Sequence, residues 1–361
     1  MGDRRETRQG QLRDRLSAQG LDGLLVQALP NIRYLTGFTG SSALLLVRAS
    51  DAVLVTDFRY AAQAPREVGA AARVEIDQVN VWERLGRVIA ERPGAALGFE
   101  AHVMTIRDRE RLSSLPPARW EGIPDLVERL RQVKDEDEVA AIGAAAQLAQ
   151  SALGEVLPTI RAGESEVAVA ARLEAALRRG GSEWHPFQTI VASGPRSALP
   201  HARISDRTIE RGEWLLLDFG AQVHGYCADL TRTCVVGARA DERQRAVYEV
   251  VRQAQRRALD HIRAGQSGRE ADALAREVIA RQGFGEAFGH SLGHGLGLEV
   301  HEAPRLSSTA ESALPVGAVV TVEPGIYLPG WGGVRLEDDV YLGASGPVVL
   351  SDNRVELVEL V

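Results

Sequence analysis

Three of the chain's eight histidines lie within seventeen residues, in the segment FGHSLGHGLGLEVHEAP that spans residues 288–304. They are His290, His294 and His301, and glycines flank His294 on both sides. Glycine permits backbone conformations and close approaches that a side chain would block. We therefore expect His294 to reach a metal ion while leaving room for a substrate, with His290 and His301 available as hydrogen-bond donors or acid/base groups.

Four acidic residues end or follow apolar runs that have the pattern of strands. Asp218 ends WLLLD, Asp229 lies in CADLTRT, Glu323 follows VVTV, and Glu337 follows GVRL. A carboxylate at the buried end of a strand is costly unless a cation compensates it. Side chains alternate between the two faces of a strand, so Arg335 shares a face with Glu337 and is the one evident side-chain cation for such a cluster.

Two divalent cations would supply the missing positive charge. Together with a bridging hydroxide, the two cations would nearly cancel the negative charge of the four carboxylates, since the imidazole is neutral. Arg335 would offset the negative charge that remains. This mixed oxygen and nitrogen donor set suits Mn²⁺, Co²⁺, Zn²⁺ or Fe²⁺. Plainer interpretations exist for each feature, since Asp218 could be a turn former and Arg335 part of a surface ion-pair network. One metal centre accounts for all of them together.

Composition and charge narrow the classes of function. The chain has 361 residues, of which 45% are hydrophobic and 25% charged, enough for two globular domains. Its net charge of −7 disfavours a nucleic-acid partner. The charged N-terminus lacks the apolar segment of a signal peptide, and the chain has no long apolar run, so we expect a cytoplasmic protein without a membrane partner.

Lysine and cysteine usage disfavours further mechanisms. Lys134 is the one lysine among 42 basic residues and has no glycine-rich context, so neither a P-loop nor a pyridoxal Schiff base is expected. Cys227 and Cys234 are seven residues apart on what is predicted as one strand. They would point to opposite faces, so we expect no disulfide between them.

The periodicity predicts two domains. Residues 1–125 alternate helical and strand patterns, with helices at 12–20 and 81–94 and strands at 21–26, 43–47 and 52–57, as in an α/β unit. Residues 126–361 are predicted as an α+β domain. Its expected helices lie at 123–157, 165–181, 241–263 and 269–282, and its strands at 188–194, 213–237, 317–328 and 333–343.

In this order the motifs resemble those of a known family. The spacing of Asp218 and Asp229, together with GHGLGLEVHE, TVEPGIY and GVRLEDDV, is similar to that of the metallopeptidases with the pita-bread fold, which include methionine aminopeptidases, aminopeptidase P and prolidase. NIRYLTGFTGSSALLLV and TDFRYAAQA resemble the N-terminal domain of the Xaa-Pro branch. The resemblance covers nearly the whole chain.

The resemblance implies a site residue by residue. Asp218 would hold one divalent ion, Asp229 and Glu337 would bridge two, and His294 and Glu323 would hold the other. His201, His290 and His301 match the family's substrate-facing histidines, and Arg335 its supporting arginine. Glu323 would also act as the general base, and His301 and His201 would stabilise the oxyanion. The family commonly forms homodimers.

The implied reaction is hydrolysis of the Xaa-Pro bond, which releases the N-terminal residue. The spacing of fourteen residues between Glu323 and Glu337 and the chain length favour a prolidase, acting on dipeptides, over an aminopeptidase P, acting on longer peptides. An arginine that pairs with the proline carboxylate would distinguish them, and the sequence does not identify it. A metal-free peptide-binding module and a creatinase-like amidinohydrolase are more distant alternatives, because all five ligand positions are retained.

Overall fold

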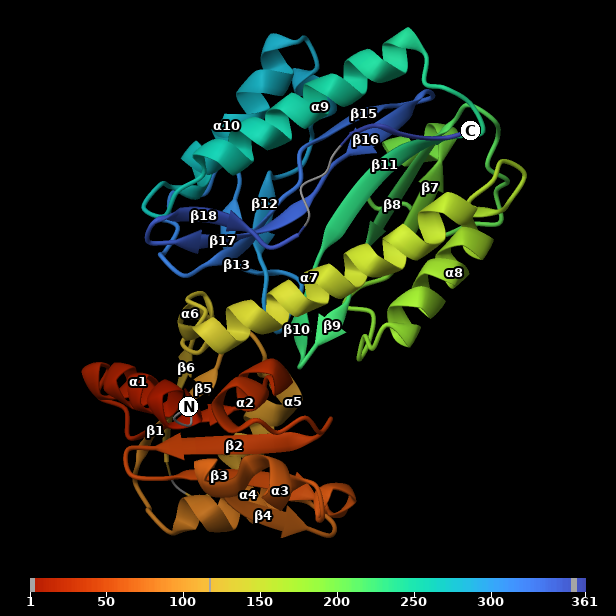
Figure 1. The fold of residues 1–361 in the computed structure, drawn as a ribbon. Helices are drawn as coiled ribbons and strands as arrows, with labels where there is room; N and C mark the ends of the chain where they lie inside the picture. Colours follow the sequence, from red (N-terminus) through yellow and green to blue (C-terminus); the bar gives the residue numbers. More distant parts are fainter. Residues whose placement is uncertain (1–3, 117, 352–355) are drawn as a thin grey trace. The chain divides into compact units, whose positions relative to one another are not determined.

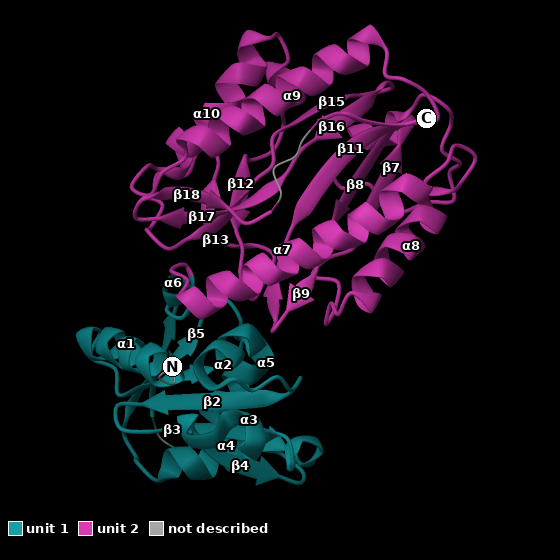
Figure 2. Cartoon of the chain, in the orientation of Figure 1, with its two compact units in different colours: residues 1–131 teal, residues 132–361 magenta. Residues whose placement is uncertain are grey.

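The computed structural model describes residues 4–116, 118–351 and 356–361. The chain divides into two compact units, Met1–Arg131 and Gln132–Val361 (Figure 2). The predicted α/β character of the first part and α+β character of the second are confirmed (Figure 1). None of the helices in the described ranges combines the length and apolar character that crossing a membrane requires.

The first unit is built on one mixed sheet with the strand order β4-β3-β2-β1-β5-β6. The strands are β1 Gly23–Val26, β2 Ala43–Arg48, β3 Ala52–Asp57, β4 Arg73–Asp77, β5 Ala96–Glu100 and β6 Arg119–Ile123. The helices are α1 Arg4–Ala18, α2 Leu29–Thr36, α3 Ala64–Val68, α4 Val81–Ala90, α5 Ile106–Ser113 and α6 Glu128–Arg131. Strands β1 and β2 are buried along their whole length, as expected of apolar runs covered on both faces.

The second unit contains two larger sheets and four long helices. One sheet has the order β19-β11-β8-β7, and the other has the order β13-β12-β14-β17-β18. The strands of the first are β7 Ile190–Ser193, β8 Trp214–Phe219, β11 Leu230–Val236 and β19 Val358–Leu360. Those of the second are β12 Gly293–Gly295, β13 Glu302–Leu306, β14 Val319–Val322, β17 Asp338–Gly343 and β18 Gly346–Val349. Two hairpins complete the unit, formed by β9 Gln222–Val223 with β10 Tyr226–Cys227, and by β15 Gly325–Leu328 with β16 Gly332–Arg335.

A pair of helices packs on each of these sheets. Helices α7 Glu136–Val156 and α8 Glu166–Arg179 share a buried core with β7, β8 and β11. Helices α9 Glu242–His261 and α10 Gly268–Arg281 share another with β14, β15, β16 and β17. Figure 1 shows the two pairs on opposite sides of the unit, with the strands between them.

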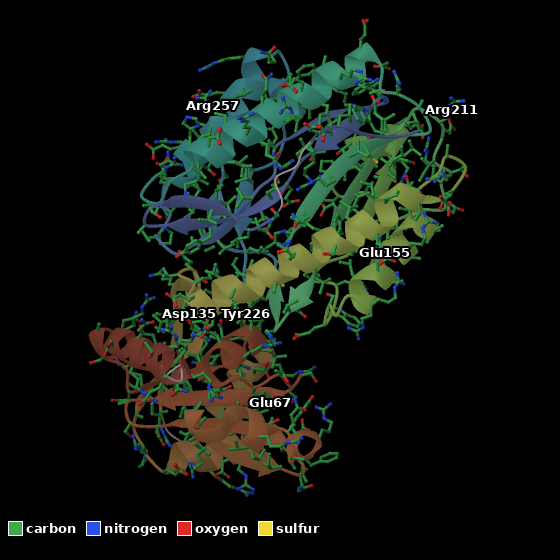
Figure 3. The ribbon with its side chains drawn as sticks, in the orientation of Figure 1. Glu67, Asp135, Glu155, Arg211, Tyr226 and Arg257 are labelled. Atoms are coloured by element: carbon green, nitrogen blue, oxygen red, sulfur yellow. The ribbon has the colours of Figure 1, made fainter. Side chains whose placement is uncertain are left out.

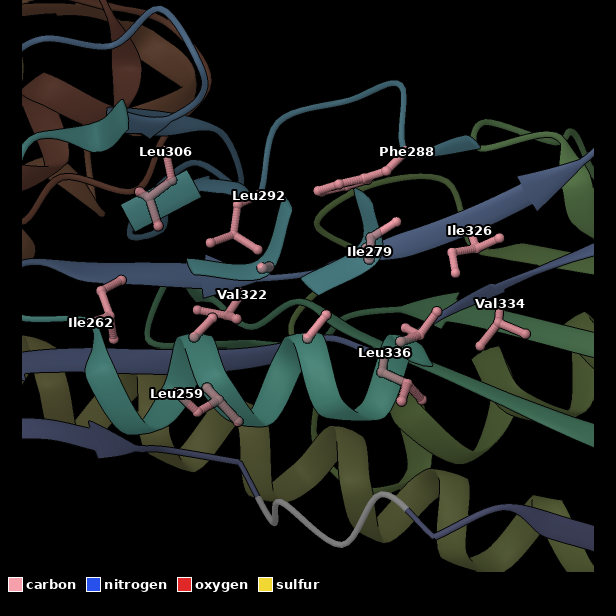
Figure 4. Packing of buried hydrophobic residues seen from close by; sticks show 14 of the residues in the cluster. Leu259, Ile262, Ile279, Phe288, Leu292, Leu306, Val322, Ile326, Val334 and Leu336 are labelled. Atoms are coloured by element: carbon pink, nitrogen blue, oxygen red, sulfur yellow. The ribbon is translucent and has the colours of Figure 1, made fainter. Parts of the chain in front are cut away.

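The core beneath α9 and α10 supports the strands that carry several predicted site residues. Leu259 and Ile262 of the α9 segment and Ile279 of α10 pack in one cluster with Val322 and Leu336 (Figure 4). Val322 immediately precedes Glu323, and Leu336 immediately precedes Glu337. Because interiors are close-packed, these neighbours fix the backbone from which both acidic side chains project.

The prediction of one continuous helix over residues 123–157 is wrong, because the structure has two helices there, α6 and α7. Asp135, labelled in Figure 3, is the N-cap of α7. Its carboxylate accepts the backbone N–H of Glu138, whose side chain accepts the backbone N–H of Asp135, and this capping box starts a new helix. On the outer surface of α9, Arg257 pairs with Glu277 of α10 (Figure 3).

Three predicted strand runs are divided as well. The run predicted at 317–328 ends at Val322 in β14 and resumes at Gly325 in β15, and Glu323 lies in the break. The predicted strand at 333–343 ends at Arg335 in β16 and resumes at Asp338 in β17, and Glu337 lies in the break. Cys227 and Cys234 lie on different strands, β10 and β11, and not on one. The two-residue break between these strands carries Asp229. In all three places, the backbone leaves the regular ladder at an acidic residue that was predicted as a metal ligand.

Substitution of Gly293 in β12 tests how tightly the sheet is packed next to His294. A β-carbon at Gly293 would lie 2.0 Å from the backbone oxygen of Thr321, whereas one at Gly289 would meet nothing within 4 Å. We expect Gly293→Ala to lower the free energy of unfolding by about 1–3 kcal/mol, as overpacking does. Gly289→Ala should change it by less than about 0.5 kcal/mol. Urea denaturation measures both, and equal midpoints for the two variants would contradict the packing described.

Candidate metal centre

An isolated antiparallel bridge between Thr231 of β11 and Glu337 connects the two sheets of the second unit. The backbone N–H of Glu337 donates to the carbonyl of Thr231 at 3.1 Å, and the Thr231 hydroxyl donates to Glu337 Oε2 at 2.5 Å. Asp229 lies two residues before Thr231, and Asp218 of β8 is the register partner of Thr231. The bridge therefore brings acids from both sheets to one place.

The second sheet contributes His294 from β12 and Glu323 from the end of β14. Thr321 holds both, because its hydroxyl accepts the His294 backbone N–H at 3.1 Å and donates to Glu323 Oε1 at 3.2 Å. His294 Nδ1 lies 3.1 Å from the carbonyl oxygen of Gly295 and must carry the proton of that hydrogen bond. Its Nε2 is then unprotonated and faces the acids, 3.4 Å from Glu323 Oε1 and 3.8 Å from Asp229 Oδ2.

Donor atoms of Asp229, His294 and Glu337 lie within 4.8 Å of one another, close enough to bind one ion. Asp218, Asp229 and Glu337 are all buried. Among the described residues, Asp218 Oδ1 and Asp229 Oδ1 are buried without a hydrogen-bond partner. A buried carboxylate oxygen without a partner is strongly unfavourable, and a divalent cation is the partner that carboxylates and imidazole would share. The donor set therefore fits divalent metal ions.

The pKa values of these side chains in the metal-free protein also indicate a site that binds cations. Burial raises the pKa of Glu323 to about 8, with a further contribution from the charge of Asp218. Burial, followed by the charges of neighbouring carboxylates, also raises the pKa values of Asp229 and Glu337 well above their usual range. Burial lowers the pKa of His294 to about 4, which keeps its imidazole neutral. These acids lack enough neighbouring positive charge to stabilise their ionised forms. The imidazole of His294, in contrast, is already in the neutral form that binds a metal ion.

Arg335 connects this cluster to a hydrogen-bonded chain that also includes Tyr327 and His290. Its guanidinium pairs with Asp218, donates from Nε to the Thr231 hydroxyl at 3.0 Å, and donates from Nη1 to the Tyr327 hydroxyl at 2.8 Å. The Tyr327 hydroxyl lies 2.8 Å from His290 Nε2, and His290 Nδ1 lies 2.8 Å from the carbonyl oxygen of Ser291. Since that carbonyl only accepts, Nδ1 carries the proton and Tyr327 donates to Nε2.

This chain gives His290 a different environment from the one predicted. Both of its ring nitrogens are hydrogen-bonded to protein groups, and burial lowers its pKa to about 4. His290 therefore orients Tyr327, which in turn holds Arg335. The predicted contact of His290 with substrate stays a prediction.

All nine sequence-predicted site residues line a single cavity of about 620 Å³. They are Asp218, Asp229, His294, Glu323, Glu337, His201, His290, His301 and Arg335. His294 and His301 have ring centroids 4.3 Å apart. The structure thus brings the predicted residues together, while the role of each, as ligand, base or substrate contact, remains a prediction.

Several residues of the site were not predicted from the sequence. Phe187, Arg203 and Arg305 line the cavity, and Tyr327 lies behind it. A signal for Tyr327 was present, because in the hairpin β15–β16 Gly325 pairs with Arg335, and side-chain alternation places Tyr327 on the same face as Arg335. Arg203 and Arg305 had no comparable signal among 41 arginines.

The raised pKa values predict an unusual pH dependence for the metal-free protein. A folded state in which Glu323 has a pKa of about 8 binds more protons than the unfolded state, where the value is near 4.5, so stability falls as pH rises towards 8. The lowered pKa values of His290 and His294 oppose this only below their usual 6.5. We therefore expect the Tm of metal-free protein to fall between about pH 6.5 and 8 and added Mn²⁺ to reverse the trend.

Thermal denaturation at several pH values, after treatment with a chelator, measures this effect. Glu323→Gln is the matched control, because it removes the titrating group and should flatten the slope. A Tm of metal-free protein that rises from pH 6.5 to 8 would show that these acids are not clustered as described.

The comparisons with known proteins agree with the fold. Residues 140–344 match the model of metallopeptidase family M24, and residues 8–133 match the creatinase/prolidase N-terminal domain. An Xaa-Pro dipeptidase of Pyrococcus furiosus is 44% identical over 239 residues, which covers 66% of this chain and 68% of the relative.

Two solved structures extend the likeness to nearly the whole chain. An Xaa-Pro dipeptidase from Bacillus anthracis is 39% identical, with a TM-score of 0.95 over 99% of this chain and 100% of that one. An X-Pro aminopeptidase from Thermotoga maritima is 38% identical, with a TM-score of 0.90 over 97% and 99% of the two chains. With the acids and histidines gathered around one cavity, these matches establish that the chain belongs to metallopeptidase family M24 and carries a creatinase/prolidase N-terminal domain.

Proposed function

We propose that this chain is a metal-dependent Xaa-Pro dipeptidase, which hydrolyses the bond between an N-terminal residue and a following proline. The observation that carries the proposal is the cavity that combines a buried carboxylate and histidine cluster with further histidines and arginines. The names of the related dipeptidases support the substrate class.

Five residues would hold the metal ions, namely Asp218, Asp229, His294, Glu323 and Glu337. Bound divalent ions lower the pKa of a water molecule and polarise the scissile carbonyl. Mn²⁺, Co²⁺ and Zn²⁺ all suit this donor set. Homodimer formation, which the family resemblance implies, belongs to the same proposal, as does a cytoplasmic location.

The chain's own groups would carry the proton transfers. Glu323 lies beside His294 in the cavity wall, where it would accept the proton of the attacking water and deliver it to the leaving proline nitrogen. His301 and His201, which also line the cavity, would donate hydrogen bonds to the carbonyl oxygen as negative charge develops.

Arginines in the cavity wall favour a dipeptide substrate. Arg335 is engaged by Asp218 and Tyr327, but Arg203 and Arg305 also line the cavity. Arg305 of β13 is the register partner of His294 in β12, so the two side chains lie on the same face of the sheet. The free carboxylate of an Xaa-Pro dipeptide would pair with such a guanidinium, whereas a longer peptide has an uncharged amide at that point.

Turnover of defined peptides tests the proposal directly. We expect chelator-treated protein to be inactive on an Xaa-Pro dipeptide, and Mn²⁺, Co²⁺ or Zn²⁺ to restore cleavage. Glu323→Gln should reduce kcat at least about 10³-fold, because it removes both a metal ligand and the base. Faster cleavage of an Xaa-Pro-Yaa tripeptide would make the enzyme an aminopeptidase P. No cleavage with any metal would favour the binding module or the amidinohydrolase.

Arg305→Ala tests the basis of dipeptide preference. Loss of a charge-assisted hydrogen bond to the proline carboxylate, worth about 1.5–3 kcal/mol, should raise KM for the dipeptide about 10- to 150-fold. KM for the same dipeptide with an amidated C-terminus should change little. Arg257→Ala, on the outer surface of α9, is the matched control. Equal effects on the free and the amidated dipeptide would exclude Arg305 as the carboxylate partner.

A further inference from the structure

The wall of the cavity includes a segment between β7 and β8 that forms no regular strand. We call residues 194–205 the His201 loop. Pro200, His201, Ala202 and Arg203 of this loop line the cavity. Two groups of the proposed function, His201 and Arg203, therefore depend on where this loop lies.

Both ends of the His201 loop are held by one buried carboxylate, that of Glu166 at the start of α8. At the first end, Glu166 Oε1 accepts the backbone N–H of Ser193 at 2.8 Å and its hydroxyl at 2.9 Å. At the other end, Glu166 Oε2 accepts the Ser205 hydroxyl at 2.6 Å. The Glu166 side chain is fully buried, so water does not compete for these bonds.

An arginine within the loop strengthens the same anchor. Arg196 Nε lies 3.1 Å from Glu166 Oε2, and Arg196 Nη2 donates to the carbonyl oxygen of Arg203. The chain of contacts thus runs from Glu166 through Arg196 to the backbone of Arg203, which lines the cavity. Charge-assisted bonds of this kind are about twice as strong as neutral ones.

Among the described residues, the Glu166 carboxylate accepts hydrogen bonds from Ser193, Arg196 and Ser205 alone. The loop meets the metal centre separately, where Arg335 Nη1 donates to the carbonyl oxygen of Pro200 at 3.3 Å. Changing Glu166 would therefore loosen the loop while leaving the metal-binding side chains with their own partners.

We propose that Glu166 is a positioning residue that fixes the His201 loop so that His201 and Arg203 are placed to bind substrate. The inference rests on the proposed function for its substrate. Closing a loop of this length costs conformational entropy, and an anchor shared by both ends offsets that cost before substrate arrives. Without the anchor, only a fraction of molecules holds the loop in the competent position, and apparent affinity falls by that fraction.

Glu166→Gln tests the proposal, with Glu164→Gln as its matched control. Glu164 is also a carboxylate near the start of α8, but it pairs with Arg172 and accepts the backbone N–H of Arg161, outside the loop. In Glu166→Gln we expect KM for an Xaa-Pro dipeptide to rise about tenfold. The kcat value should change less than about threefold, because saturating substrate selects the competent loop. Glu164→Gln should match the wild type in both constants.

Two readouts without turnover separate this role from general destabilisation. Hydrogen exchange should become faster in residues 194–205 of metal-loaded Glu166→Gln, and not in Glu164→Gln. The dissociation constant for Mn²⁺, measured by calorimetry, should match the wild type in both. If Glu166→Gln does not fold, Ser205→Ala removes one end of the anchor and should show the same changes at smaller amplitude.

A KM for Glu166→Gln equal to that of the wild type would overturn the proposal. Faster hydrogen exchange outside the loop, together with a fall in kcat as large as the rise in KM, would also overturn it. Weakened Mn²⁺ binding in Glu166→Gln would also overturn it, because the effect would then reach the metal centre. Failure of the proposed function is seen separately, as absence of dipeptide cleavage by the metal-loaded wild type before any variant is compared.

Discussion

Four carboxylates that are largely removed from water and line one cavity impose the main constraint on this molecule. Asp218, Asp229, Glu323 and Glu337 come from both sheets of the second unit, and Arg335 is paired with Asp218 alone among them. Such a cluster is unfavourable unless its protons or bound cations neutralise it. The second unit therefore has to hold the acids rigidly, close enough to share ions and with too little water to ionise freely.

The fold meets this demand with hydroxyl groups and close packing. Thr231 joins the two sheets and links Arg335 to Glu337, and Thr321 links His294 to Glu323. The core beneath α9 and α10 fixes the backbone on which Glu323 and Glu337 lie. Glu337, His294 and Glu323 are thus each held by a neutral hydroxyl group that takes no part in the proposed chemistry.

Much of this arrangement could be predicted from the sequence, because acids at strand ends, a glycine-flanked histidine and strand alternation have direct physical meanings. The motifs identified nine of the residues that line the cavity and the character of both parts of the chain. The breaks around Glu337, Asp229 and Asp135 were missed, because a capping box or a turn within a continuous pattern hardly changes its periodicity. Glu166, Arg203 and Arg305 could not be identified, since their importance arises from contacts between residues distant in sequence.

We expect the acids of the metal-free site to retain protons that divalent ions displace. Calorimetric titration of chelator-treated protein with Mn²⁺ at pH 7, in two buffers of different ionisation enthalpy, measures the protons released per ion. Because Glu323 has a pKa of about 8 and His294 is already neutral, we predict release of at least one proton from the carboxyl cluster. Tight binding without proton release would show instead that the acids are ionised before the metal arrives.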